Sequence, residues 1–344
     1  MLSPILDENG LLCWRSIMDC AENIVITAHS GPDGDAIGSS LGLAEFLRQQ
    51  GKNVSVVMPN RFPDFLRWMK GTDKIVLYDA SPSEADRLIA ESDVIFSLDY
   101  NSLDRADALG QVIAESRAKK IMVDHHLSPS DFADFMVSYP ELSSTSELVF
   151  RIIWQMDGYS AMGSDAAAAI YCGMMTDTGA FAYNSSRPEI FYIIGRLLEK
   201  GIDKDKIYRN VYNNYSRNRV RLMGYILYRK LYFYNRMRAC VYTLTQSEMK
   251  DFKFQKGDAE GLVNMPLMVH GMLLSIALRE DTEKPVIRVS LRSVDDFPCN
   301  EMAARFFNGG GHLNAAGGEL CCNMDEALKI AEAAVEAYRD RLAM

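Results

Sequence analysis

Short apolar segments alternate with amphipathic segments over the first third of the chain. Residues 23–29, 53–59, 93–99 and 119–126 contain apolar runs that are typical of buried strands. Residues 36–51 have apolar side chains at helical spacing and end in a glycine, which is a common helix stop. Because strands and helices alternate in this way in α/β folds, the sequence predicts a parallel sheet with crossover helices.

The pattern changes after residue 190, in a chain of 344 residues that is longer than a single hydrophobic core usually serves. The next thirty or so residues are first amphipathic and helical, then polar and basic, as expected for a connector. Strand-like alternation returns beyond them and is followed by helical segments. The sequence therefore predicts a larger parallel-sheet domain over 1–190, a helical linker over 191–220 and a smaller α/β domain over 221–344.

The charge and the cysteine content restrict the classes of partner and compartment. The formal net charge of −9 disfavours binding to long duplex nucleic acid, which requires a basic face that displaces counterions. The longest apolar run, 166–175, is too short to span a bilayer, so no membrane partner is expected. The start of the chain does not resemble a signal peptide, and the seven cysteines include no CxxC pair. We therefore expect a cytoplasmic protein with reduced thiols.

Four groups of acidic residues and histidines lie at the ends of predicted strands or on adjacent loops. They are His29, Asp33 and Asp35; Asp99; Asp124, His125 and His126; and Asp177. Any one carboxylate at such a position could simply cap the following helix. In open parallel sheets, however, ligands bind beyond the carboxyl ends of the strands. Four groups at equivalent places therefore favour one shared site.

So many carboxylates cannot converge without repelling one another, and divalent cations remove this repulsion. Hard oxygen donors with a few imidazoles suit Mn²⁺ or Mg²⁺, whereas a structural zinc site would favour thiolates. Two such ions could share a water molecule, lower its pKa and stabilise in-line attack at phosphorus. The sequence therefore predicts a site for divalent cations at this edge of the sheet.

The second predicted domain contains a glycine-rich segment, 309–318, whose role the residues alone leave open. Its exposed backbone N–H groups could form an anion-binding nest beside the next helix, with His312 pointing into the site. The same glycines could instead make a tight connection that allows close helix packing. Arg292, on the preceding strand, could likewise contact an anion or lie on a solvated face.

Six segments, in their order along the chain, resemble one family of phosphoesterases. "HSGPDGDAIGS", "SLDY", "VDHH" and "MMTDTGAF" resemble the four motifs of the DHH phosphoesterases, and "VSLRS" and "FNGGGHLNAAGG" resemble the DHHA1 domain that accompanies them. The match covers nearly the whole chain. Within the family, the chain resembles the subgroup of bacterial nano-RNases that also dephosphorylate 3′-phosphoadenosine 5′-phosphate (pAp). Many relatives have a fourth glycine where this chain has Asn308, a residue that tolerates left-handed backbone geometry.

The resemblance implies two divalent cations, with Mn²⁺ preferred and Mg²⁺ as the alternative. The metal ligands that it implies are His29 and Asp33 for the first ion, Asp35, His125 and Asp177 for the second, and Asp99 as a bridge between both.

The resemblance also implies catalytic and substrate-binding residues. His126 would face the phosphate as a hydrogen-bond donor or acid, and Asp124 would orient its histidine neighbours. The residues that would hold the far end of the substrate are Arg292, Ser293, Gly310, Gly311 and His312.

The implied activity is hydrolysis of short single-stranded oligoribonucleotides (nano-RNA) to mononucleotides, and of pAp to AMP, in a cleft between the two domains. Other activities stay open at this point. They are a cyclic-dinucleotide or linear-dinucleotide phosphodiesterase, an exopolyphosphatase or pyrophosphatase, and a nucleotide sensor that binds without turnover. The sequence also leaves open whether the chain acts as a monomer or as a homodimer.

Overall fold

The computed structural model describes residues 2–255 and 257–343, and the chain divides into two compact units, Met1–Asn214 and Tyr215–Met344. Residues 191–214 belong to the first unit, and residues 215–220 belong to the second. In the part of the chain that the structure describes, no helix has both the length and the apolar character that a membrane span requires.

The first unit contains a six-stranded, wholly parallel sheet with the strand order β3-β2-β1-β4-β5-β6. The strands are β1 (Asn23–Thr27), β2 (Asn53–Met58), β3 (Val76–Leu77), β4 (Val94–Leu98), β5 (Lys119–Asp124) and β6 (Phe135–Ser138). The predicted parallel sheet is therefore confirmed. The edge strands β3 and β6 escape prediction because they have only two and four residues.

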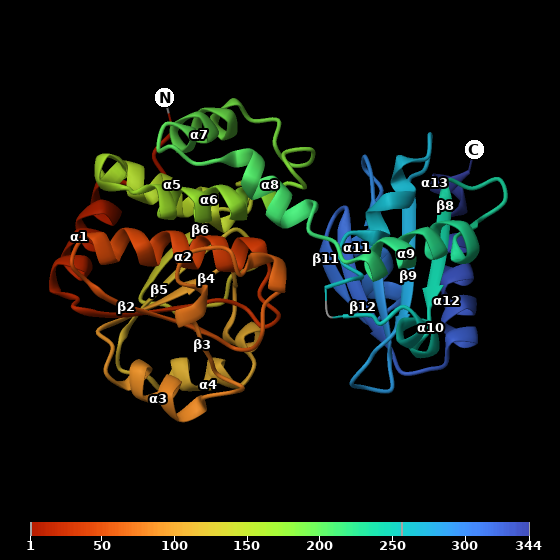
Figure 1. Ribbon diagram of the computed structural model, residues 1–344, viewed down its shortest axis with the longest axis horizontal. Helices are drawn as coiled ribbons and strands as arrows, with labels where there is room; N and C mark the ends of the chain where they lie inside the picture. Colours follow the sequence, from red (N-terminus) through yellow and green to blue (C-terminus); the bar gives the residue numbers. More distant parts are fainter. Residues whose placement is uncertain (1, 256, 344) are drawn as a thin grey trace. The chain divides into compact units, whose positions relative to one another are not determined.

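Helices cover both faces of this sheet (Figure 1). One face carries α2 (Gly34–Gln49), α5 (Thr145–Gln155) and α6 (Ser164–Asp177), and the other carries α3 (Pro82–Ala90) and α4 (Ala108–Glu115). The remaining helices of this unit are α1 (Glu8–Cys20), α7 (Pro188–Leu198) and α8 (Lys204–Tyr212). Because side chains alternate along a strand, Ile24 and Ile26 of β1 join the core under α2, whereas Val25 joins the core under α3 and α4.

Helices α2 and α6 pack at close range because glycines of α2 face α6. These glycines recur every four residues, at Gly34, Gly38 and Gly42, and so lie on one side of the helix. A Cβ atom on Gly38 would lie 2.6 Å from the carbonyl oxygen of Ala169, and one on Gly34 would collide with Thr176. The contact therefore places the beginning of α2 beside the end of α6.

The second unit contains a six-stranded mixed sheet with the order β11-β12-β10-β9-β8-β7. Its strands are β7 (Tyr232–Phe233), β8 (Ala239–Leu244), β9 (Leu274–Glu280), β10 (Ile287–Ser293), β11 (Gly310–His312) and β12 (Ala315–Leu320). Neighbouring strands pair antiparallel, except that β8 and β9 pair in parallel.

Helices also cover both faces of this second sheet. They are α9 (Arg217–Tyr225), α10 (Gln246–Asp251), α11 (Cys299–Phe306), α12 (Met324–Ala337) and α13 (Arg339–Leu342). Residues of α11 and α12 join the core on one face, and residues of α9 and α10 join a smaller core on the other.

The glycine-rich segment 309–318 forms a β-hairpin. Strand β11 pairs along its length with β12, and the next helix begins only at Met324, so the segment does not lie beside the start of the next helix. The predicted close helix packing is present at the end of α11 instead, because a Cβ atom on Gly318 would collide with the carbonyl oxygen of Phe307. Gly311 has a φ of +142°, and a Cβ atom there would collide with Ala315. Asn308 adopts the left-handed conformation expected of it, with a φ of +50°.

Candidate metal centre

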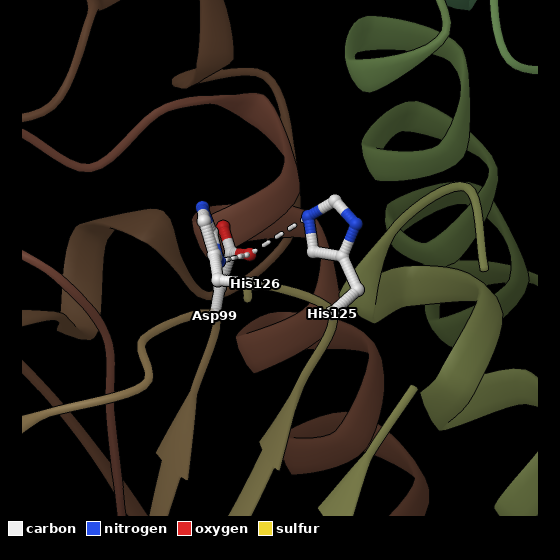
Figure 2. A group of neighbouring side chains, drawn as sticks. All are labelled: Asp99, His125 and His126. Atoms are coloured by element: carbon white, nitrogen blue, oxygen red, sulfur yellow. Dashed lines mark ion pairs between the residues drawn. The ribbon is translucent and has the colours of Figure 1, made fainter. Parts of the chain in front are cut away.

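Acidic residues and histidines follow the neighbouring strands β4 and β5 at the carboxyl edge of the first sheet. Asp99 comes directly after β4, and His125 and His126 come directly after β5. Figure 2 shows that these three side chains lie together. Oδ1 of Asp99 lies 3.5 Å from Nε2 of His125 and 3.8 Å from Nδ1 of His126.

The two carboxylate oxygens of Asp99 face different histidines. Oδ1 faces His125, whereas Oδ2 lies 3.5 Å from Nε2 of His29. The side chain is only 2% exposed. The backbone of Asp99 has a φ of +65°, a conformation that is uncommon outside glycine and recurs at functional sites. Asp99 therefore stands between two groups of potential ligands.

Both buried histidines are held through Nδ1, so that Nε2 points at carboxylates. Nδ1 of His29 lies 2.9 Å from the carbonyl oxygen of Ser30, and Nδ1 of His125 lies 3.3 Å from that of Leu142. Because a carbonyl oxygen only accepts hydrogen bonds, Nδ1 must be the donor in each pair. This arrangement leaves Nε2 available to a cation, as in many metal sites.

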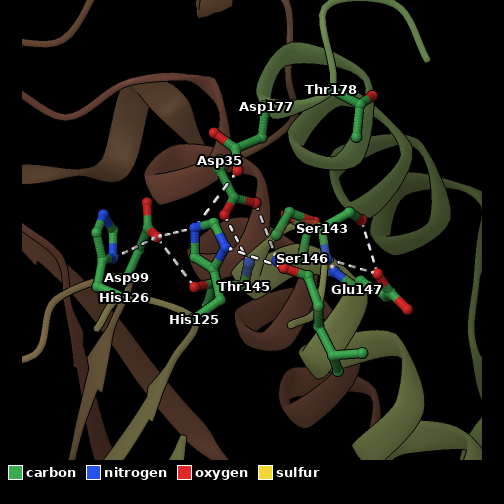
Figure 3. Close-up of polar contacts among 12 residues, drawn as sticks. Asp35, Asp99, His125, His126, Ser143, Thr145, Ser146, Glu147, Asp177 and Thr178 are labelled. Atoms are coloured by element: carbon green, nitrogen blue, oxygen red, sulfur yellow. Dashed lines mark hydrogen bonds and ion pairs between the residues drawn. The ribbon is translucent and has the colours of Figure 1, made fainter. Parts of the chain in front are cut away.

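Asp35 and Asp177 complete the cluster on the side of His125. Asp177 is the last residue of α6, and its Oδ2 lies 3.4 Å from Nε2 of His125. Asp35 lies in the first turn of α2, and its two oxygens accept hydrogen bonds from the backbone N–H groups of Thr145 and Ser146, at 2.7 and 2.9 Å (Figure 3). The start of α5 therefore fixes the Asp35 carboxylate.

Asp33 combines the two interpretations that the sequence allowed for an acidic residue at a strand end. It is the N-cap of α2, where its Oδ1 accepts hydrogen bonds from the N–H groups of Asp35 and Ala36. The same oxygen lies 3.9 Å from Nε2 of His29, and the side chain is 48% exposed. Asp33 therefore lies at the solvent-facing rim of the cluster.

The cluster requires positive charge. Burial raises the pKa of Asp35 well above its usual range, and the charges of Asp99 and Asp177 raise it further. Burial also raises the pKa of Asp177 to about 7, although the neighbouring His125 opposes this shift. Burial lowers the pKa of His29, but the nearby carboxylates outweigh it and raise that pKa well above the usual value. Such carboxylates stay fully ionised only beside protonated histidines or bound cations.

The residues fit divalent cations in number and in chemistry. Within each of three overlapping groups, the potential ligand atoms all lie within 4.8 Å of one another. The groups are His29, Asp33 and Asp99; Asp35, His125 and Asp177; and Asp99, His125 and His126. Carboxylate oxygens with a minority of imidazole nitrogens suit Mn²⁺ among the common divalent ions.

Asp124 is the last residue of β5 and contacts His126. It is fully buried, and its Oδ1 lies 2.7 Å from Nδ1 of His126. Its other oxygen accepts a hydrogen bond of 3.0 Å from the backbone N–H of His126. The two contacts fix both the backbone and the ring of His126.

Sequence reasoning missed the residues of α5 that hold the acidic cluster. Besides its contact with Asp35, Thr145 donates a hydrogen bond of 3.0 Å from Oγ1 to Oδ1 of Asp99. The Ser144-x-x-Glu147 pattern ahead of an apolar run is a signal for a helix start and could have located this turn. No local signal indicates that the turn faces Asp35, which is 110 residues away in the chain.

The predicted substrate-binding residues of the second unit lie on two faces of its sheet. Arg292 of β10 and His312 of β11 both pair with Ala315 of β12, from opposite sides, so their side chains share one face. Ser293 is the next residue along β10 and points to the opposite face, where its hydroxyl donates to the carbonyl oxygen of Phe297 at 2.8 Å. The hairpin therefore brings Arg292 and His312 together and leaves Ser293 in the core.

Comparisons with known proteins agree with this architecture. Residues 23–174 match the model of the DHH family, N-terminal domain, and residues 237–337 match that of the DHHA1 domain. A bifunctional oligoribonuclease and PAP phosphatase NrnA of Thermus thermophilus is 27% identical, over 93% of this chain and 90% of the relative. The NrnA enzyme of Bacillus subtilis is 25% identical, over 90% of this chain and 92% of its own length.

Solved structures are also similar to this chain, and one of them has high sequence identity over almost the full length. It is an exopolyphosphatase-related protein from Bacteroides fragilis, which is 51% identical and superposes with a TM-score of 0.95. The alignment covers 98% of this chain and 99% of that protein.

Proposed function

Because the chain belongs to the DHH family and carries a DHHA1 domain, we propose that it is a metal-dependent phosphoesterase of short oligoribonucleotides. In this proposal, short single strands are cut to mononucleotides, and pAp is converted to AMP. The substrate class is taken from the similarity to two NrnA enzymes over most of the chain. The observation that carries the chemistry is Asp99, whose two oxygens face His29 and His125 from the centre of the acidic cluster.

We assign the six clustered ligands to two divalent cations. His29 and Asp33 serve one ion, Asp35, His125 and Asp177 serve the other, and Asp99 serves both. Two cations bound in this way lower the pKa of a water molecule and stabilise negative charge on the phosphate. We favour Mn²⁺ over Mg²⁺ because Mg²⁺ prefers oxygen ligands and water to imidazole.

His126 is assigned to the reacting phosphate. Its Nδ1 is engaged by Asp124, which sets the orientation of the ring. A histidine held in this way can present Nε2 as a hydrogen-bond donor to a phosphate oxygen, or as an acid to the leaving group. Asp124 supports this role by accepting a hydrogen bond from Nδ1, which holds the ring in place.

In the second unit, Arg292 and His312 are assigned to the substrate. They share one face of the sheet, and a guanidinium group matches the geometry of phosphate oxygens. Gly310 and Gly311 leave the backbone of β11 uncovered beside them, so a nucleotide could approach closely. Ser293 supports the hairpin through its bonds to Phe297 and Asn314.

The proposal is tested by comparing substrates under one condition. Purified protein is incubated with Mn²⁺ and pApA, pAp, a 5-mer RNA, a 24-mer RNA, cyclic di-AMP or pyrophosphate, and initial rates are measured. We expect the highest rates with pApA and the 5-mer, and no turnover after the metal is removed with a chelator. Faster hydrolysis of cyclic di-AMP or pyrophosphate than of pApA would contradict the proposed substrate class. Tight nucleotide binding without any turnover would identify a sensor instead.

A further inference from the structure

The first residue of α5 contacts carboxylates that come from two different elements. The backbone N–H of Thr145 donates to Oδ2 of Asp35 at 2.7 Å, and its hydroxyl donates to Oδ1 of Asp99 at 3.0 Å (Figure 3). Asp35 lies in α2 and Asp99 follows β4, so Thr145 connects acidic residues that come from different parts of the sheet edge. All three residues are buried.

The hydroxyl of Thr145 determines how the Asp99 carboxylate is turned. With Oδ1 held by Thr145, the other oxygen, Oδ2, faces His29 at 3.5 Å. A carboxylate rotates easily about its last torsion, because that torsion has broad minima. A hydrogen bond from a fixed donor removes this freedom before any ligand arrives.

The donor itself is fixed by a buried network around Glu147. The hydroxyl of Ser144 accepts a hydrogen bond of 3.0 Å from the N–H of Glu147, and this bond caps α5. The Glu147 carboxylate accepts hydrogen bonds from Ser143, from Arg151 at 2.7 Å and from Arg187 at 2.8 Å. All these bonds join residues of the first unit, and together they fix the first turn of α5.

We propose that Thr145 is a positioning residue that orients Asp99, the carboxylate that we assign to both cations. The inference rests on the proposed function, because it presumes that Asp99 binds metal. Thr145 does not contact the ions or the substrate in this proposal. It acts only through the carboxylates that it holds, and its hydroxyl is the group that matters for Asp99.

The test compares Thr145→Val with Thr145→Ser in the full-length protein. Valine keeps the shape and the backbone N–H bond to Asp35 but lacks the hydroxyl, whereas serine keeps the hydroxyl. Mn²⁺ binding is measured by calorimetry, and the hydrolysis of pApA is measured over a range of Mn²⁺ concentrations. We expect Thr145→Val to bind the more weakly held of the two Mn²⁺ ions about 10–100-fold less tightly. A loss of this size is usual when a hydrogen-bond partner of a metal ligand is removed. Thr145→Ser should stay within a few-fold of the wild type, and excess Mn²⁺ should restore much of the rate of Thr145→Val.

Ser144→Ala provides the matched control. It removes the cap of the same helix turn but contacts neither carboxylate, so it should lower the thermal midpoint and weaken Mn²⁺ binding much less than Thr145→Val does. If Thr145→Val behaves like Ser144→Ala, the threonine has only a structural role and the inference is wrong. Thr145→Ala, which also lacks the hydroxyl and adds no bulk, replaces Thr145→Val if the valine variant does not fold.

The same experiment separates the two proposals. A wild-type protein that binds no Mn²⁺ overturns both the proposed function and the role of Thr145. A wild-type protein that binds Mn²⁺ and hydrolyses pApA, together with a Thr145→Val variant of equal affinity, overturns the role of Thr145 alone.

Discussion

Asp124 contacts His126 at two points. One carboxylate oxygen lies 2.7 Å from the ring nitrogen Nδ1, and the other accepts a hydrogen bond of 3.0 Å from the backbone N–H. The Asp124 carboxylate is fully buried, whereas the His126 side chain is 18% exposed. The pair therefore has a fixed inner member and an outer member that solvent or substrate can reach.

Replacing the inner member should impair catalysis more than metal binding. Asp124→Asn keeps the shape but loses the carboxylate charge that strengthens the hydrogen bond from Nδ1 of His126. We expect the rate of pApA hydrolysis to fall about 10–100-fold, in line with the loss of other groups that orient a histidine. Initial rates and calorimetric Mn²⁺ titrations of the same samples provide the check. An unchanged rate would show that the charge of Asp124 does not matter to the reaction.

A single glycine of α6 should be essential to the cluster. A Cβ atom on Gly173 would lie 2.9 Å from Oδ1 of Asp35 and would collide with the hydroxyl of Ser146. Gly173→Ala should therefore displace the start of α5 and cost about 1–3 kcal/mol of stability, as overpacking of a core usually does. Chemical denaturation and Mn²⁺ affinity should both show the loss.

The control for this prediction is Gly195→Ala. Gly195 lies inside α7, and a Cβ atom there would have no neighbour within 4 Å. Alanine is favoured over glycine in helices, so this variant should be as stable as the wild type or more stable by up to about 1 kcal/mol. Equal effects of the two substitutions would remove the steric argument for Gly173.

The strand ends could be predicted from the sequence, whereas the contacts between distant elements could not. Local apolar runs located β1, β2, β4 and β5. The acidic residues and histidines that follow β1, β4 and β5 converge because parallel strands end at one edge. The close packing of Gly38 on α6 and the hydrogen bonds of Thr145 depend on contacts between remote parts of the chain. The hairpin after Asn308 was missed because its glycines hide the alternation that marks a strand.

Arg292 should matter for substrates that carry a second nucleoside. A hydrogen bond to a charged group contributes about 1.5–3 kcal/mol, so Arg292→Ala should lower kcat/KM for pApA roughly 10–100-fold. Hydrolysis of the small phosphodiester bis-p-nitrophenyl phosphate should change little, and Mn²⁺ affinity should not change. Arg288→Ala is the control, because it removes the same charge from the same face of β10. The native Arg288 pairs with Asp281 and Glu319, so its loss should not affect the hydrolysis of pApA. Equal losses on both substrates would place Arg292 at the scissile phosphate.

Substrate length should have an optimum near two to five nucleotides. The net charge of −9 offers no extended basic track, so phosphates beyond the metal centre gain little attraction. Rates for 2-mer, 5-mer, 12-mer and 24-mer single-stranded RNA should fall with length and depend weakly on salt, and duplexes should remain uncut. If the 24-mer is cut as fast as the 2-mer, or if salt inhibits steeply, a long basic contact surface must exist.

The most direct test of the account is the number of Mn²⁺ ions bound by the wild type and by Asp99→Asn. Asparagine preserves the shape of Asp99 but loses the charge, and it offers only one oxygen in place of the two that face His29 and His125. Calorimetry and metal analysis should find two ions per wild-type chain. The well-folded variant should bind at most one ion tightly and should lose activity by several orders of magnitude. Two tightly bound ions with near-normal turnover in Asp99→Asn, or no metal binding by the wild type, would contradict a centre built around Asp99.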